Sequence, residues 1–133
     1  MKPIDKLAWV YLKDRKILTT RSKGKNAWYI PGGKREEGES DQQALIREIK
    51  EELEVDLIPE TLTYLDKFKA QAHGKPDGVL VQLTCYTGDY KGELKPSAEI
   101  EAISWFNSNA NLKLLSDSTI LLLNYLKEKD LID

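Results

Sequence analysis

Apolar residues alternate, or form short runs rich in β-branched side chains, over much of the chain, and this pattern predicts strands. Residues 6–24 hold two such runs on either side of the polar segment KDRK, which predicts a β-hairpin. Residues 62–70, 79–90 and 99–106 predict further strands, because turn-rich segments separate them. The segment WYI predicts a short strand that ends at Pro31, where proline and the following glycine pair interrupt sheet pairing.

Two other stretches change to the three- and four-residue spacing that is typical of helices. Apolar residues recur in this way within residues 40–53, where Ser40 or Asp41 can cap the first turn, and again within residues 117–130. The order is strands, helix, strands and helix, without internal repeats or linkers. This order predicts an α+β fold in which a mixed β-sheet is sandwiched between α-helices. A length of 133 residues fits one domain, which we expect over residues 1–133.

The composition excludes several classes of partner. The chain is 41% hydrophobic and 32% charged with a net charge of -2, so its bulk electrostatics attract neither nucleic acid nor an anionic membrane. Its apolar runs are far shorter than the ~20 residues of a membrane helix, and its first residues lack a signal-peptide core, so we expect a cytoplasmic protein. Cys85 is the single cysteine, which excludes an internal disulfide and a cysteine-rich metal site and fits a buried apolar position.

The segment REIKEELEV, residues 47–55, concentrates negative charge on one predicted helix. Glu48 lies one turn from both Glu51 and Glu52, and like charges at this spacing repel each other. Glutamate is a good helix former, so a solvated helix face is one interpretation. The other interpretation is a missing cation, because clustered carboxylates bind Mg²⁺ or Mn²⁺. The upstream segment PGGKREEGES favours the second interpretation.

The spacing of these residues resembles the Nudix box, the signature of the Nudix hydrolase superfamily, over residues 33–55. Five residues separate Gly33 from Glu39, seven separate Glu39 from Arg47, and the acidic helix residues follow in the order of the family. The preceding WYIPGGK segment, the late strand and the last helix also follow the order of Nudix domains, so the resemblance covers most of the chain. The final glycine of the box is Glu54 here, which leaves open how the helix ends, because a left-handed residue at that point is usually glycine.

The resemblance implies a metal site built from the residues of the box. Glu48 and Glu52, with Glu51 close by, would be the main metal ligands, and the carbonyl oxygen of Gly32 would be a further ligand. A late acid would complete the metal site or act as the base, and Glu99 is our first candidate. The supporting residues are expected to be Glu39 and Gly33, with Glu101 as the second choice of late acid. The catalytic residues are expected to be Arg47, Glu48, Glu51 and Glu99.

The sequence offers several residues for substrate binding near the box. Basic residues can hold phosphate groups, and aromatic residues can stack on a base. We expect Arg21, Lys34 and Trp28 to bind substrate, although core packing is an alternative for the aromatic residue. His73 lies in a turn-rich segment that we expect over the site, but we favour a plain surface position for it over a role in the site. The further candidates are Lys23, Lys25 and Arg35 for phosphate, and Trp9 and Tyr29 for the base.

The resemblance implies hydrolysis of a nucleoside diphosphate linked to another group, with Mg²⁺ as the cofactor and Mn²⁺ as an alternative. The chain reads AQAH past the box, where ADP-ribose hydrolases carry a marker proline and diadenosine polyphosphate hydrolases a marker tyrosine. We therefore favour a nucleoside triphosphate or a related small nucleotide. The alternatives are ADP-ribose or another nucleotide sugar, and a nucleotide sensor that binds without turnover. Expected partners are the nucleotide and, as an open alternative, a second copy of the chain in a homodimer.

Overall fold

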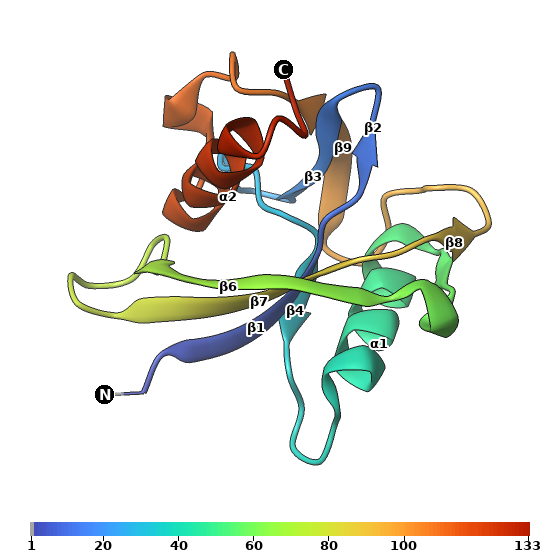
Figure 1. The fold of residues 1–133 in the computed structure, drawn as a ribbon. Coiled ribbons are helices and arrows are strands. Elements are labelled where there is room, and N and C mark those ends of the chain that lie inside the picture. Colours follow the sequence, from blue (N-terminus) through green and yellow to red (C-terminus); the bar gives the residue numbers. More distant parts are fainter. Residues whose placement is uncertain (1) are drawn as a thin grey trace.

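The computed structural model describes residues 2–133, which form a mixed β-sheet with a helix on either face, together with two smaller sheets (Figure 1). None of the helices in these residues is both long enough and apolar enough to cross a membrane. The helices are α1 (Asp41–Leu53) and α2 (Asp117–Glu128), with short 3-10 turns at Pro59–Thr61 and Leu112–Leu114. The strands are β1 (Ile4–Trp9), β2 (Leu12–Lys13), β3 (Lys16–Ser22), β4 (Gly32–Lys34), β5 (Asp56–Leu57), β6 (Thr63–Gln71), β7 (Leu80–Thr87), β8 (Tyr90–Lys91) and β9 (Ile100–Phe106).

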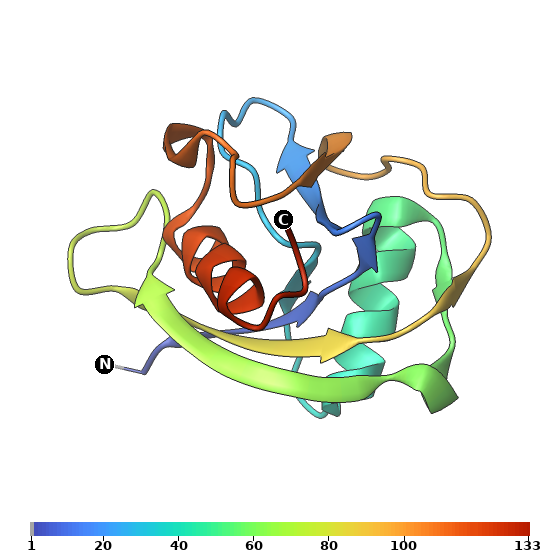
Figure 2. The ribbon, with the colours of Figure 1, turned by 45° about the horizontal axis from the view of Figure 1, so that its top comes forward.

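The largest sheet has the strand order β4-β1-β7-β6 and mixes two kinds of pairing. Strand β1 runs parallel to β7, whereas β4 pairs with β1 and β6 pairs with β7 in the antiparallel direction. A second sheet has the order β2-β3-β9, and β5 pairs with β8 in a small third sheet. Figure 2 shows the long strands β6 and β7 curving along α2. The predicted mixed sheet is confirmed.

Alternating residues of β1 explain why a helix covers each face of the sheet. Leu7 and Trp9 belong to the buried cluster that includes the apolar residues of α1, whereas Ala8 and Val10 belong to the cluster of α2. Successive side chains of a strand point to opposite faces, so the apolar run from Leu7 to Val10, at the end of β1 and just after it, needs cover on both faces. The predicted sandwich of a sheet between two helices is therefore confirmed (Figure 1).

The structure corrects two predictions about strands. The predicted hairpin over residues 6–24 is only partly formed, because the first run breaks after Trp9 and β1 joins the large sheet, leaving only the short β2 to pair with β3. The turn of that hairpin has positive φ angles at Asp14 and Arg15. The prediction that pairing ends at Pro31 was wrong, because β4 begins immediately after it, at Gly32, and pairs with β1. Here the glycine pair is part of the sheet rather than its end.

The predicted first helix is confirmed, with Ser40 as its N-cap. The Ser40 hydroxyl accepts a hydrogen bond from the backbone N–H of Gln43 at 3.2 Å, and the side-chain oxygen of Gln43 accepts one from the backbone N–H of Ser40 at 2.9 Å. This reciprocal capping box pairs two N–H groups that the first turn would leave unpaired. The helix ends at Glu54, whose left-handed conformation (φ 59°, ψ 27°) supplies what the missing glycine would have supplied.

Candidate active site

Helix α1 directs its acidic residues to different environments. Glu52 is buried, with 6% of its surface exposed, and its Oε1 accepts a hydrogen bond from the backbone N–H of Gly32 at 3.1 Å. The Glu48 side chain, one turn earlier, is 15% exposed. The Glu51 side chain is 54% exposed, because it lies on a different side of the helix. Glu48 and Glu52 therefore face the interior beside β4, while Glu51 faces solvent.

The glycine pair of β4 lets the backbone approach both a neighbouring strand and this acidic face. A Cβ atom at Gly32, whose φ is 146°, would lie 2.0 Å from the carbonyl oxygen of Leu7. A Cβ atom at Gly33 would lie 2.4 Å from the carboxyl carbon of Glu48. Both distances are too short for any side chain, so the absence of side chains here creates room for strand pairing and for the Glu48 carboxylate.

Arg47 connects the loop before α1 to the helix. Its guanidinium donates to both carboxylate oxygens of Glu39, to Oε1 of Glu48 at 2.8 Å and to the backbone carbonyl of Lys34 at 3.1 Å. Hydrogen bonds from Arg47 lower the pKa of Glu39 to about 2, so this pair stays ionised over the whole neutral range. The rigid fork of the guanidinium thus fixes the position of Glu48 relative to the box loop.

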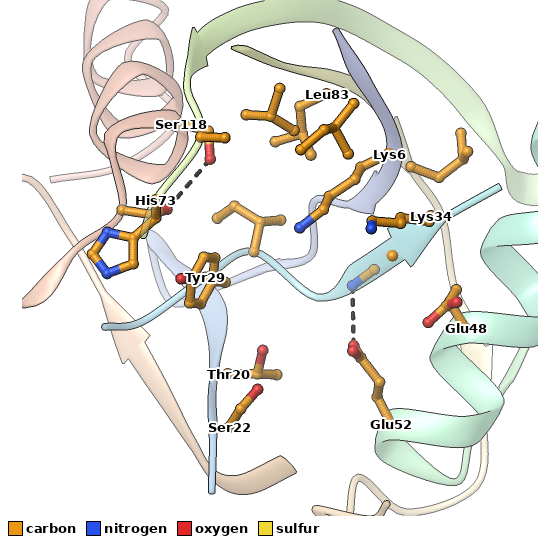
Figure 3. A pocket seen from close by; sticks show the side chains of 18 of the residues that line it. Lys6, Thr20, Ser22, Tyr29, Lys34, Glu48, Glu52, His73, Leu83 and Ser118 are labelled. Carbon is orange, nitrogen blue, oxygen red and sulfur yellow. Dashed lines mark hydrogen bonds between the residues drawn. The ribbon is translucent and has the colours of Figure 1, made fainter. Parts of the chain in front are cut away.

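A cavity of about 420 Å³ lies next to the acidic face (Figure 3). Glu48, Glu52 and Glu99 line one part of it, and Lys6 and Lys34 enter it from strands β1 and β4. Farther along, Tyr29 and His73 lie edge to face with their ring centroids 5.7 Å apart. The remaining side chains that line it include Ile30, Val81 and Leu83, the hydroxyl residues Thr20, Ser22, Ser116 and Ser118, and the lysines Lys25 and Lys75.

The cavity contains some of the residues predicted from the sequence to bind substrate and not others. Lys34 lines it, and so does Glu99, the residue predicted as the late acid. Trp28 does not, because its ring packs on Phe106 in the core beside α2, with centroids 5.4 Å apart. Arg21 is also absent from its lining: the guanidinium lies over the Trp28 ring, 5.5 Å from its centroid, and forms an ion pair of 3.1 Å with Glu101. The structure therefore assigns Arg21, Trp28 and Glu101 to a contact outside the cavity.

Other residues discussed from the sequence do not line the cavity and make contacts elsewhere. Arg35 forms ion pairs with Asp5 at 3.0 Å and Asp41 at 2.6 Å, so it holds the box loop against β1 and α1. Trp9 is fully buried, and its indole N–H donates to the carbonyl of Gly88 at 3.0 Å. Cys85 is buried, as predicted.

Three residues that line the cavity, Lys6, Tyr29 and His73, were not among the substrate-binding residues favoured from the sequence. Lys6 was not predicted as a site residue, because it lies in a strand far from the box in the sequence. Tyr29 takes the cavity position that we expected for Trp28. His73 is exposed, as the favoured surface position predicted, and it also lines the cavity. For Trp28 and Tyr29 the sequence did offer a signal, because adjacent residues of an extended segment point in opposite directions and only one of the two could face the cavity.

Burial dominates the electrostatics of the acidic face. Burial raises the pKa of Glu52 to about 8, and the nearby charges of Glu48 and Glu99 act in the same direction. Burial also raises the pKa of Glu48, against the opposing effect of Arg47. On the other side of the cavity, burial and the charge of Lys34 lower the pKa of Lys6. Burial thus disfavours the charged form of Glu48, Glu52 and Lys6 alike.

Sequence and structure comparisons give the family of this chain. The family model described as a NUDIX domain matches residues 3–121. An ADP-ribose pyrophosphatase of Methanocaldococcus jannaschii is 31% identical over 121 residues, covering 89% of this chain and 70% of that protein. A dihydroneopterin triphosphate diphosphatase of Escherichia coli is 36% identical over 67 residues, so this match covers 49% of this chain and only 45% of that protein.

The fold agrees with these sequence matches. The crystal structure of a MutT NUDIX hydrolase from Burkholderia pseudomallei has a TM-score of 0.77 and 25% sequence identity to this chain, covering 93% of this chain and 98% of the other. The chain therefore belongs to the Nudix hydrolase family.

Nudix hydrolases generally use a divalent metal ion, and the acidic face fits one in part. The buried Glu52 carboxylate has no ion pair among residues 2–133, and Glu48 pairs with Arg47 alone, so a cation with oxygen ligands would add opposite charge to this face. Within residues 2–133, no three acidic, histidine or cysteine side chains are gathered closely enough to hold an ion by themselves. Glu48 is instead bonded to Arg47, and the expected ligand Glu51 is more exposed and forms a 3.6 Å ion pair with the same guanidinium. Glu99 is the third carboxylate that lines the cavity.

Proposed function

We propose that this chain is a Mg²⁺-dependent pyrophosphohydrolase that cleaves a phosphoanhydride bond in a nucleoside diphosphate linked to another group. The observation that carries the proposal is the separation of charge within one cavity of about 420 Å³ (Figure 3). Carboxylates of Glu48, Glu52 and Glu99 line one part of it, and amino groups of Lys6 and Lys34 line another. A polyphosphate chain carrying a divalent cation has the complementary arrangement, with anionic oxygens for the lysines and a cation for the glutamates.

Glu48 and Glu52 are the residues that would hold the metal, with Glu51 and the carbonyl oxygen of Gly32 as further candidate ligands. Mn²⁺ is the alternative to Mg²⁺ for such oxygen donors. A bound divalent ion would neutralise charge on the phosphate oxygens and lower the pKa of a water molecule. Gly33 contributes by leaving space for the Glu48 carboxylate, as its missing side chain would overlap that group.

The other residues of the site hold groups in position or move a proton. Arg47 fixes Glu48 through a 2.8 Å hydrogen bond, and Glu39 in turn fixes Arg47, so both act as positioning residues. Glu99 lines the same cavity and is the carboxylate that we assign to accept the proton of the attacking water. Lys34 binds phosphate, and Tyr29 replaces Trp28 as the aromatic side chain available to a base.

The favoured substrate is a nucleoside triphosphate or a related small nucleotide. Two relatives are named an ADP-ribose pyrophosphatase and a dihydroneopterin triphosphate diphosphatase. The compounds in these names both contain a phosphoanhydride bond and differ in the group attached to it. ADP-ribose or another nucleotide sugar is therefore the second candidate. A catalytically weak nucleotide sensor is the third, and the retention of every acidic position of the box argues against it.

The proposal is tested by incubating the protein with a panel of nucleoside triphosphates, ADP-ribose and other nucleotide sugars in Mg²⁺ and identifying the products by chromatography. We expect the phosphoanhydride bond of one class of substrate to be hydrolysed, and that class identifies the attached group. Nucleotide binding without hydrolysis of any compound would favour the sensor. If the protein neither binds nor hydrolyses any member of the panel, the proposal is wrong.

A further inference from the structure

Two lysines that enter the cavity lie directly opposite each other across a pair of strands. Lys6 of β1 and Lys34 of β4 are partners in the antiparallel register, next to the partners Leu7 and Gly33. Side chains of directly opposed residues share a face of the sheet, and like charges in that arrangement destabilise the strand pair. Figure 3 shows both lysines reaching into the cavity from the strands, while Glu48 and Glu52 approach from α1. A third lysine, Lys75, lines the same cavity.

No acidic side chain in the described part of the chain is close enough to pair with these two lysines. The ion pairs of residues 2–133 join other groups, such as Arg35 with Asp5 and Arg47 with Glu39 and Glu48. The glutamates of α1 influence Lys6 through charge, but their own hydrogen bonds go to the Gly32 backbone and to Arg47. The arginines near the site are therefore paired with acids, whereas the opposed lysines keep their donors available to a ligand.

An opposed pair of ammonium groups facing a cavity, one from the partly buried Lys6 and one from the exposed Lys34, is the arrangement expected of an anion site. Each ammonium offers three donors and no acceptor, so an anionic ligand with several oxygen atoms can bridge the two. A phosphate group bridging the lysines would relieve their mutual repulsion, and its other oxygens would remain free to face the glutamates. Apart from Glu48, Glu52 and Glu99, the side chains that line the cavity are apolar, aromatic, hydroxyl-bearing or basic, so they add no further negative charge.

We propose that Lys6 is a phosphate-binding residue that acts with Lys34 as one anion site for the phosphate chain of the substrate. The proposal rests on a nucleotide being the substrate, but the anion site itself can be tested without turnover. Because two amino groups converge there, a longer phosphate chain with more charge should gain more from the site than a diphosphate diester. Lys6 would then help to select nucleoside triphosphates over nucleotide sugars.

The test measures binding of inorganic triphosphate by titration calorimetry in the absence of divalent metal ions. The proteins compared are the wild type, Lys6→Met, Lys6→Arg, and Lys69→Met as the matched control. Lys69 is an exposed lysine on β6 of the same sheet that does not line the cavity. Loss of one charged donor to phosphate should weaken binding in Lys6→Met by about tenfold. Lys6→Arg should retain most of the affinity, and Lys69→Met should bind like the wild type.

A triphosphate affinity of Lys6→Met equal to that of the wild type would overturn the proposal, as would a wild type that does not bind triphosphate at all. An Lys6→Arg variant as weak as Lys6→Met would also overturn it, because the charge would then not be what matters. Lys6→Gln repeats the measurement if Lys6→Met does not fold, as judged by circular dichroism. An absence of hydrolysis in the nucleotide panel would contradict the proposed function and leave this binding result standing.

Steady-state kinetics on any nucleoside triphosphate that is hydrolysed give an independent check. Lys6→Met should raise KM by about tenfold and change kcat less, because binding of unreacted phosphate is lost. A purely structural role for Lys6, such as balancing the charge of Glu52, would instead lower kcat and leave triphosphate binding unchanged. That result would overturn the proposal.

Discussion

Both carboxylate oxygens of Glu39 accept hydrogen bonds from the guanidinium of Arg47, with Nε···Oε2 and Nη2···Oε1 distances of 2.8 Å. The same guanidinium donates to Glu48, so the loop before α1 and the acidic face of α1 form one connected unit. A planar fork that is held on two sides has little freedom to rotate. The position of the Glu48 carboxylate is therefore set by Glu39, a residue nine positions away that does not line the cavity.

Glu39→Gln should reduce activity by weakening this unit. The amide can accept only one of the two hydrogen bonds from Arg47 and carries no charge. We expect kcat and the affinity for Mg²⁺ to fall by about 10- to 100-fold, as is usual when a partner behind a metal ligand is lost. Glu37→Gln is the control, because Glu37 is an exposed acid of the same loop. If Glu39→Gln and Glu37→Gln have the same kcat and Mg²⁺ affinity, Glu39 has no positioning role.

Gly33→Ala tests the close approach of the backbone to Glu48. The added methyl group would lie 2.4 Å from the Glu48 carboxyl carbon, so the carboxylate would have to leave its position. We expect most of the activity to be lost while the protein remains folded. Gly78→Ala introduces an unfavourable backbone conformation on a loop, where φ is 92° and the space is open, so it should lower stability but leave kcat unchanged. Full activity of Gly33→Ala would show that the Glu48 carboxylate is not needed where the structure places it.

Glu54→Gly should stabilise the protein. Glu54 is exposed and holds a left-handed conformation (φ 59°) at the end of α1, which costs a residue with a side chain about 1–2 kcal/mol. Glycine avoids this strain but has more freedom in the unfolded chain, so a net gain of up to ~1 kcal/mol in the free energy of unfolding is expected. Chemical denaturation of the wild type, Glu54→Gly and Glu54→Ala measures it. A glycine variant no more stable than the alanine variant would show that the helix end is unstrained.

The metal-free protein should become less stable as the pH rises from about 4.5 to about 8. The pKa of Glu52 is raised from 4.5 to about 8 in the folded state, so the folded protein holds a proton that the unfolded chain has released. One unit of pKa difference corresponds to about 1.4 kcal/mol, and the loss of stability should therefore reach a few kcal/mol. Denaturation in a chelator at several pH values measures it. Glu52→Gln should lack this component, and identical pH profiles would contradict the assignment.

The sequence was sufficient to predict α1 and the spacing of the acidic residues along it, because both depend on local pattern. The interval from Gly33 to Glu52 runs from the end of β4 through one loop into α1, and the geometry of the helix follows from its periodicity and a capping box. The opposed pair of Lys6 and Lys34 could not be predicted in the same way. It depends on β1 leaving its apparent hairpin and pairing with β4, and strand partners are chosen by the packing of the whole domain.

Trp28 and Tyr29 show a second limit of prediction from sequence. They are adjacent, both are aromatic, and either could have faced the cavity. In the structure Trp28 packs on Phe106 and Tyr29 lines the cavity. A shift of one residue in an extended segment exchanges the two faces, so composition alone could not decide between them. Glu54 is the opposite case, because the sequence posed the question of the helix end and the backbone angles answered it.

Glu52 is the buried carboxylate that we propose helps to hold a divalent cation required by the reaction. The most direct test follows hydrolysis of the best nucleotide substrate during a titration with Mg²⁺, for the wild type, Glu52→Gln and Glu54→Gln. Glu54→Gln removes a charge from the exposed end of the same helix and should behave like the wild type. Glu52→Gln should lose at least about 100-fold in kcat or need far more Mg²⁺. Equal rates and equal Mg²⁺ dependence in the two variants would contradict the claim.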